Sequence, residues 1–126
     1  MNISEYFSHI RNQFSTFPFT GSIQITEDIR TSSEGFIKGN ISFVDGSELN
    51  FREYVSTESE PPKRYSYSFH YSKNQSLIFR YDNAPHHKEI SSFPHHKHLK
   101  ENEVVPCAIP IIDTILSEIK NIIASQ

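Results

Sequence analysis

The pattern of hydrophobic and polar positions predicts a helix first, then a series of strands, then a second helix. Between residue 2 and about residue 14, apolar side chains recur every three or four positions, which is typical of one face of an α-helix. These side chains are Ile3, Tyr6, Phe7, Ile10 and Phe14. Asn2 and Glu5 have the spacing of a capping box, and Pro18 ends the predicted helix.

From residue 22 to residue 55 the period changes to two, which indicates strands with one apolar face and one wet face. The apolar positions are Ile23, Ile25, Ile29, Ile37, Ile41, Phe43, Leu49, Phe51 and Val55. Residues 44–47 predict a hairpin. A two-residue loop at Asp45 and Gly46 would place Phe43 beside Glu48, so we expect a three-residue loop that pairs apolar with apolar positions.

Glu53 interrupts this alternation, because it falls on the same face as Leu49 and Phe51. One interpretation, which we expect, is that its carboxylate lies near the strand end and reaches water. The other is that it is buried and has a partner, since an unpaired buried charge costs several kcal/mol.

A second hairpin places a histidine and an arginine on one face of the sheet. From residue 64 to residue 72, aromatic side chains alternate with serines and His70. A three-residue turn at residues 73–75 would pair Phe79 with Phe69. Because successive side chains of a strand point to opposite faces, Arg80 and Asp82 then share the face of His70.

The alternation stops after Asn83, where Pro85 and Pro94 bracket an irregular segment rich in histidine. A second helix is predicted from residue 110 to residue 124, with Pro110 in its first turn. Its apolar stripe consists of Ile111, Ile112, Ile115, Leu116, Ile119, Ile122 and Ile123. We therefore predict one α+β domain spanning residues 1–126, with a mostly antiparallel sheet of about five strands and the N- and C-terminal helices packed on one face.

Composition narrows the class of protein. The chain has no run of 18 apolar residues, no basic and apolar leader, and only one cysteine, Cys107, so we expect a cytoplasmic protein without a membrane span or disulfide framework. The net charge of −3 argues against binding nucleic acid through bulk charge. RNA remains possible as a partner, because Arg80, Lys88, Lys97 and Lys100 lie among the histidines.

Five of the seven histidines fall between residues 79 and 98, a concentration that indicates a functional surface. Cleavage of RNA beside a 2′-hydroxyl needs a base, an acid and cations, which histidine, arginine and lysine supply near neutral pH. The predicted catalytic residues are His70, Arg80, His86, His95, His96 and His98. The predicted substrate-binding residues are Lys97, Arg52, Asn83 and His87. Asp82, Pro85 and Pro94 are predicted to have structural roles, and we expect no cofactor.

Two other interpretations of the histidines stay open. In an extended strand His96 and His98 point the same way and could chelate zinc, with His86 or Asp82 completing the site. Their spacing is not a familiar zinc signature, and no cysteine pair supports it. Alternatively, histidines hydrogen-bond the loop into place, and Asp82 and Asn83 hold a turn.

The run from Arg80 to His87, followed by Phe93-Pro94-His95-His96-Lys97-His98, resembles the TumE-like toxin components of bacterial and archaeal toxin–antitoxin modules. Residues 45–54 and 65–71 match the same family in order and spacing, so the resemblance covers roughly residues 20–105.

The resemblance implies that the chain is the toxin of a type II toxin–antitoxin module. Many such toxins are ribonucleases, so it favours a small, metal-independent ribonuclease with RNA as its substrate. The implied partner is a helix-turn-helix antitoxin encoded beside it. The alternatives are a non-enzymatic toxin that inhibits a cellular target by binding, and a zinc-dependent hydrolase. The oligomeric state stays open.

Overall fold

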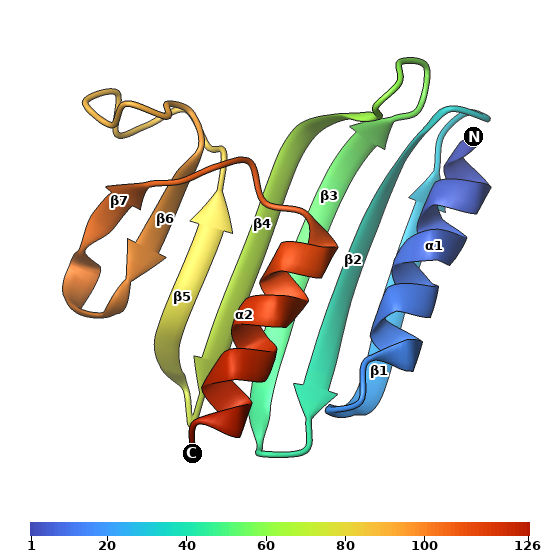
Figure 1. Ribbon diagram of the computed structural model, residues 1–126. Coiled ribbons are helices and arrows are strands. Elements are labelled where there is room, and N and C mark those ends of the chain that lie inside the picture. Colours follow the sequence, from blue (N-terminus) through green and yellow to red (C-terminus); the bar gives the residue numbers. More distant parts are fainter.

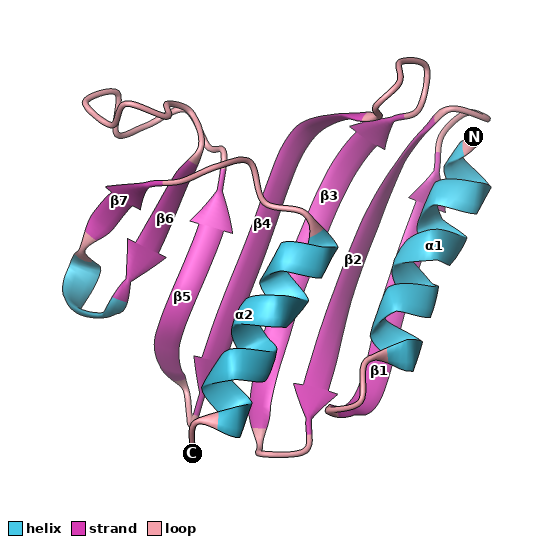
Figure 2. Ribbon diagram, in the orientation of Figure 1, coloured by secondary structure: helices cyan, strands magenta, loops and turns pink.

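In the computed structural model, seven antiparallel strands form one sheet, and both helices lie on the same face of it (Figures 1 and 2). The structure describes residues 1–126, apart from the side chain of Glu101. The elements are α1 (Ile3–Thr16), β1 (Thr20–Ile29), β2 (Glu34–Phe43), β3 (Ser47–Ser56), β4 (Lys63–Lys73), β5 (Ser76–Asp82), β6 (His96–Leu99), the 3-10 turn η1 (Lys100–Asn102), β7 (Val104–Pro106) and α2 (Ile112–Ala124).

The predicted α+β class and the placement of both helices are confirmed, whereas the number of strands is seven rather than about five. The strands lie side by side in the order of the sequence, each antiparallel to the next. The two additional strands are β6 and β7, which extend the sheet beyond β5 (Figure 1). Each is only three or four residues long, too short for a period of two to be recognised.

Helix α1 begins at the predicted capping box. The Asn2 side chain accepts a hydrogen bond from the Glu5 backbone N–H at 2.8 Å, and the Glu5 carboxylate accepts one from the Asn2 backbone N–H at 3.1 Å. Within the described residues, no helix is both long enough and apolar enough to cross a membrane.

The hydrophobic core lies between the helices and one face of the sheet. Its largest fully buried side chains are Tyr71, Phe7, Phe14, Phe69 and Phe79. They come from α1, β4 and β5, and the apolar stripe of α2 packs against them through Ile112, Ile115 and Ile119. Neither α1 nor α2 lies on the other face of the sheet, which we call the open face (Figure 1).

The β2–β3 hairpin has the predicted three-residue loop, which pairs Ile41 with Leu49 and Gly39 with Phe51. Gly46 closes this loop with φ +87°, a left-handed conformation that favours glycine. A Cβ at Gly39 would lie 2.5 Å from the Phe51 ring, so the close packing of these two strands also requires a glycine there.

The β4–β5 hairpin differs from the predicted register. Its turn consists of two residues, Asn74 and Gln75, both with positive φ, and the pairing shifts by one residue at a bulge beyond Leu77. Phe79 therefore pairs with Tyr71 and not with Phe69, which corrects the predicted pairing of Phe79 with Phe69. The bulge restores the alternation that a two-residue turn alone would invert, so the predicted faces are confirmed.

Candidate functional site

The open face carries two rows of polar side chains that run across the strands. In the first row Asn50 pairs with His70, His70 with Arg80, and Arg80 with His98. Because β6 pairs with β5, the fold brings His98 to the same face as His70 and Arg80. The three residues come from three different strands.

The second row lies one pleat further along the strands. Arg52 pairs with Ser68, Ser68 with Asp82, and Asp82 with His96. The two rows together place three histidines, two arginines and one carboxylate on a single face. Sequence alternation predicted the β3, β4 and β5 members of this set, but not the two histidines of β6.

A hollow of about 540 Å³ lies over the middle of the open face. Its cationic side chains are Lys38, Arg52 and Arg80, and His70 lies among them. Its other polar side chains are Gln24, Thr26, Asn40, Asn50 and Ser68. Lys38 was not among the predicted site residues, although its position between Ile37 and Gly39 in the alternation already assigned it to this face. Within the described residues, no acidic side chain lines this hollow.

His70 is tuned toward its neutral form. Partial burial, and then the neighbouring positive charge of Arg80, lower the pKa of the His70 imidazole from its ordinary value of 6.5. An imidazole that is neutral at physiological pH can accept a proton. The hollow therefore combines a potential base with three cationic groups.

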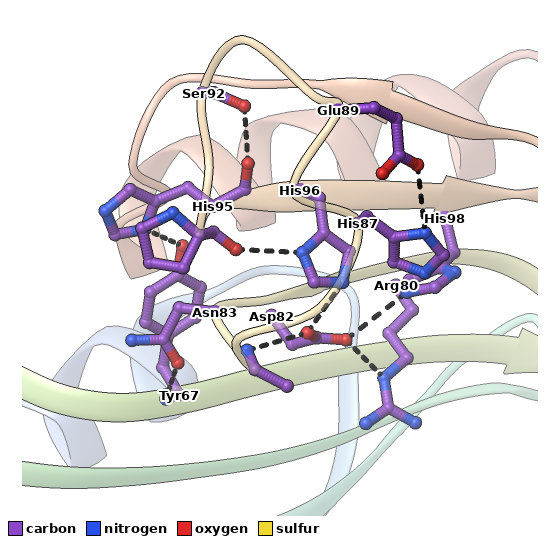
Figure 3. A network of polar contacts seen from close by, with 12 residues as sticks. Tyr67, Arg80, Asp82, Asn83, His87, Glu89, Ser92, His95, His96 and His98 are labelled. Atoms are coloured by element: carbon purple, nitrogen blue, oxygen red, sulfur yellow. Dashed lines mark hydrogen bonds and ion pairs between the residues drawn. The ribbon is translucent and has the colours of Figure 1, made fainter.

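Asp82 joins Arg80 to the histidines and to the loop that follows β5 (Figure 3). The residue is buried, with only 3% of its surface exposed. Oδ2 accepts a hydrogen bond from Arg80 Nε at 3.0 Å, and Oδ1 accepts one from the Ala84 backbone N–H at 3.1 Å. Oδ1 also lies 2.8 Å from His96 Nε2, and Oδ2 lies 3.5 Å from His98 Nε2.

His96 is the most buried histidine, with 1% of its surface exposed. Its Nδ1 lies 2.9 Å from the Pro94 carbonyl oxygen. A carbonyl only accepts, so Nδ1 carries the proton that it donates. Nε2 then faces the Asp82 carboxylate, yet it makes no hydrogen bond of acceptable geometry with a described residue.

Four imidazole rings lie close to one another near Asp82, and we call them the histidine cluster: His86, His87, His96 and His98. The ring centres of His96 and His98 are 4.8 Å apart, and that of His87 lies 5.1 Å from His96 and 5.6 Å from His98. The His86 ring lies 5.6 Å from His96. Potential ligand atoms of Asp82, His96 and His98 all lie within 4.8 Å of one another, as do those of His86, His87 and His96.

His95 and Lys97 lie away from the cluster. The His95 Nδ1 atom is 2.7 Å from the hydroxyl of Tyr67, a side chain of the core face. Lys97 Nζ donates to Glu118 of α2 at 2.7 Å. The alternation of β6 directs Lys97 to the helix face, because the residues on either side of it point to the open face. The geometry therefore favours a role of Lys97 in holding α2 over the predicted binding of substrate.

Asn83 supports the backbone near the beginning of β4. Its Oδ1 atom accepts from the Tyr67 backbone N–H at 2.9 Å, and its Nδ2 atom donates to the Tyr65 carbonyl at 3.2 Å. Both polar ends of the side chain are occupied by backbone groups. The geometry therefore favours a structural role for Asn83 over the predicted binding of substrate.

Glu53 is buried, with 2% of its surface exposed, so the expectation that it reaches water is wrong. The hydroxyl of Tyr6 donates to its carboxylate at 2.6 Å, and Arg64 Nη1 lies 3.3 Å from it. Burial raises the pKa of the Glu53 carboxyl, although Arg64 and Tyr6 oppose that shift. The second interpretation, a buried carboxylate with partners, is confirmed.

Comparison with protein families gives one finding. A family model described as Toxin TumE matches residues 9–123 of the chain. No curated protein and no solved structure matches the chain. The family match covers both helices in large part, the whole sheet, the hollow and the histidine cluster.

Proposed function

Since the chain belongs to the TumE toxin family, we propose that it is the toxin of a type II toxin–antitoxin pair and that it acts by cleaving RNA. Family membership supports the toxic role. The observation that carries the proposal of RNA cleavage is the position of His70, a histidine of lowered pKa, among Arg52, Arg80 and Lys38 in the hollow.

The proposed reaction is a transesterification at phosphorus that needs no metal ion. His70 accepts the proton of a ribose 2′-hydroxyl, and the 2′ oxygen forms a bond to the adjacent phosphorus. The bond from phosphorus to the 5′ oxygen breaks, and that oxygen takes up a proton from water in the open hollow. The products are a 2′,3′-cyclic phosphate and a free 5′-hydroxyl. A base in this position accelerates such a step by about 10² to 10⁴ fold.

Arg80 and Arg52 are proposed to bind the phosphate that reacts. A guanidinium matches two phosphate oxygens at once and stabilises the charge that develops on them. Arg80 is held by its Nε–H bond to the buried Asp82, which leaves its terminal nitrogens available to a ligand. Lys38 would add a point charge for a neighbouring phosphate. The hollow is therefore locally basic on a chain whose net charge is −3.

The direct test is cleavage of a defined RNA oligonucleotide by the purified protein. We expect products with 2′,3′-cyclic phosphate ends, and no cleavage of DNA of the same sequence, because DNA lacks the 2′-hydroxyl. His70→Gln should lower turnover by about 10² to 10⁴ fold. His9→Gln, at an exposed position of α1, is the matched control and should cleave like the wild type.

Undiminished cleavage by His70→Gln would remove this residue from the mechanism. A wild-type protein that is toxic in cells but never cleaves RNA would instead favour the non-enzymatic alternative, in which the toxin inhibits a target by binding.

The proposed partner is a helix-turn-helix antitoxin encoded beside the toxin. We expect the product of the neighbouring reading frame to co-purify with the chain, to restore growth, and to suppress RNA cleavage when added in equal amount. A neighbouring product that restores growth without binding the chain would contradict this assignment.

A further inference from the structure

We propose that Asp82, His87, His96 and His98 bind one zinc ion, which fastens the loop of residues 83–95 to the end of the sheet. The inference concerns the histidine cluster and not the hollow, and binding of zinc tests it without any measurement on RNA. It replaces the expectation, based on the lack of a familiar zinc signature, that the chain holds no cofactor.

His96 is the central ligand. Its Nδ1–H is committed to the Pro94 carbonyl at 2.9 Å, which orients the ring and directs Nε2 toward Asp82. Nε2 is buried and has no hydrogen-bond partner among the described residues. A buried nitrogen without a partner is costly in a folded protein. A hydrogen bond from Nδ1–H to a backbone carbonyl is also the usual support of a histidine that binds metal through Nε2.

Asp82 and His98 supply two further ligands from rigid strands. His96 Nε2 lies 2.8 Å from Asp82 Oδ1, so the two atoms already face one another. In the proposed site both are ligands of one cation, which takes the place of a proton between them. His98 Nε2 lies 3.5 Å from the same carboxylate, and all three ligand atoms lie within 4.8 Å of one another.

His87 supplies the fourth ligand from the loop. Its backbone has φ +61°, a left-handed conformation that is uncommon outside glycine. The centre of the His87 ring lies 5.1 Å from that of His96 and 5.6 Å from that of His98. The loop thus has an unusual backbone at the residue that would tie it to β6.

The donor set selects the metal. Three imidazole nitrogens and one carboxylate oxygen suit zinc, whereas magnesium and calcium prefer oxygen ligands. Zinc binds nitrogen at about 2.0–2.1 Å in a tetrahedral site, so its ligand atoms lie about 3.4 Å from one another. Binding would therefore move His96 Nε2 and Asp82 Oδ1 apart from their 2.8 Å and draw the more distant ligand atoms together. Four protein ligands would close the coordination shell, which is typical of a structural site rather than a catalytic one.

The experiment is titration of the chelator-treated full chain with zinc chloride, followed by calorimetry and elemental analysis. We expect one equivalent of zinc per chain, no binding of magnesium under the same conditions, and a higher melting temperature with zinc, since a ligand that binds only the folded state stabilises it. The cobalt-loaded chain should show the intense visible absorption of a tetrahedral ion.

Variants identify the ligands. His96→Ala should abolish stoichiometric binding, and His98→Ala and His87→Ala should each weaken it at least tenfold. His98 and His87 are only partly buried, so these two variants test the proposal even if His96→Ala fails to fold. His9→Ala is the control and should bind like the wild type.

Three results would overturn the proposal. The first is a wild-type chain that binds no zinc, and the second is binding that persists in a folded His96→Ala chain. The third is binding that is lost in His86→Ala but kept in His87→Ala, which would overturn the assignment of the loop ligand.

Discussion

The two faces of the sheet show how one alternating sequence produces both a core and a polar working surface. Phe69 and His70 are neighbours on β4, yet Phe69 is fully buried under the helices and His70 lines the hollow of the open face. Tyr81 and Arg80 form the same kind of pair on β5. Side chains of one face thus form the core, and polar side chains of the other face line the hollow.

The helix face also contains polar groups, but these are paired with one another. Glu53 has Tyr6 and Arg64, and Lys97 has Glu118. On the open face, Arg80 is paired with Asp82, but no acidic side chain lies among the described lining of the hollow beside Lys38 and Arg52. The lesson is that an excess of positive charge, rather than polarity alone, distinguishes the candidate site. Five experiments test this contrast between the faces.

The largest effect on stability is expected for Phe69→Ala. Removing a fully buried aromatic ring leaves a cavity and should lower the free energy of unfolding by about 3–5 kcal/mol. Its neighbour provides the control: His70→Ala should cost far less stability, while it removes the proposed RNA cleavage. Chemical denaturation of both variants makes the measurement. Equal destabilisation by the two substitutions would mean that the open face is also part of the core.

The next effect concerns the buried carboxylate. Tyr6→Phe removes the hydroxyl that donates to Glu53 and should destabilise the fold by about 1.5–3 kcal/mol. Tyr54→Phe is matched to it, because the Tyr54 hydroxyl donates at 3.0 Å to Glu34, which is not among the buried carboxylates. That control should change the denaturation midpoint very little. A midpoint for Tyr6→Phe equal to that of the wild type would show that Glu53 does not depend on Tyr6.

Arg80→Lys separates catalysis from structure. Lysine keeps the charge but loses the two-pronged geometry, so turnover of RNA should fall by about one to two orders of magnitude, or about 1.4–2.7 kcal/mol. The melting temperature should change little. If Arg80 instead serves only to hold Asp82 by their ion pair, Arg80→Lys will lower the melting temperature and will keep its activity below that temperature.

The pH dependence of cleavage tests the lowered pKa of His70. The base works only when it is neutral, so turnover is kept above its pKa and lost as the pH falls through it. A histidine with the ordinary pKa of about 6.5 would be half protonated at that pH. We therefore expect the acidic limb of the rate profile to lie below pH 6.5 in the wild type. Arg80→Lys keeps the neighbouring charge and should leave the limb in place, whereas Arg80→Gln should move it upward.

The smallest effect is expected for Lys97→Met. The ion pair between Lys97 and Glu118 is partly exposed, with 18% and 30% of the two side chains accessible, so its loss should cost less than about 1 kcal/mol. RNA cleavage should be unchanged, because Lys97 lies on the helix face. A large loss of activity in a stable Lys97→Met chain would return this residue to the site and contradict the separation of the two faces.

Periodicity in the sequence by itself determined both helices, the antiparallel strands up to residue 82 and the shared face of His70 and Arg80. These features are local, because the faces of a helix or strand follow from the spacing of side chains along it. The β4–β5 hairpin shows why the faces survived an error in the register. The two-residue turn and the bulge each shift the alternation by one residue, so together they preserve it.

Only the tertiary structure decided what lies beside what. The pairing of β6 with β5 depends on contacts between distant segments, and it divides the histidine-rich stretch between the two faces: His96 and His98 join Asp82, while Lys97 points to α2. The partners of Glu53 come from α1 and β4, and no local spacing indicates them. The physical reason is that periodicity gives a side chain its direction, whereas its neighbours are set by how the elements pack.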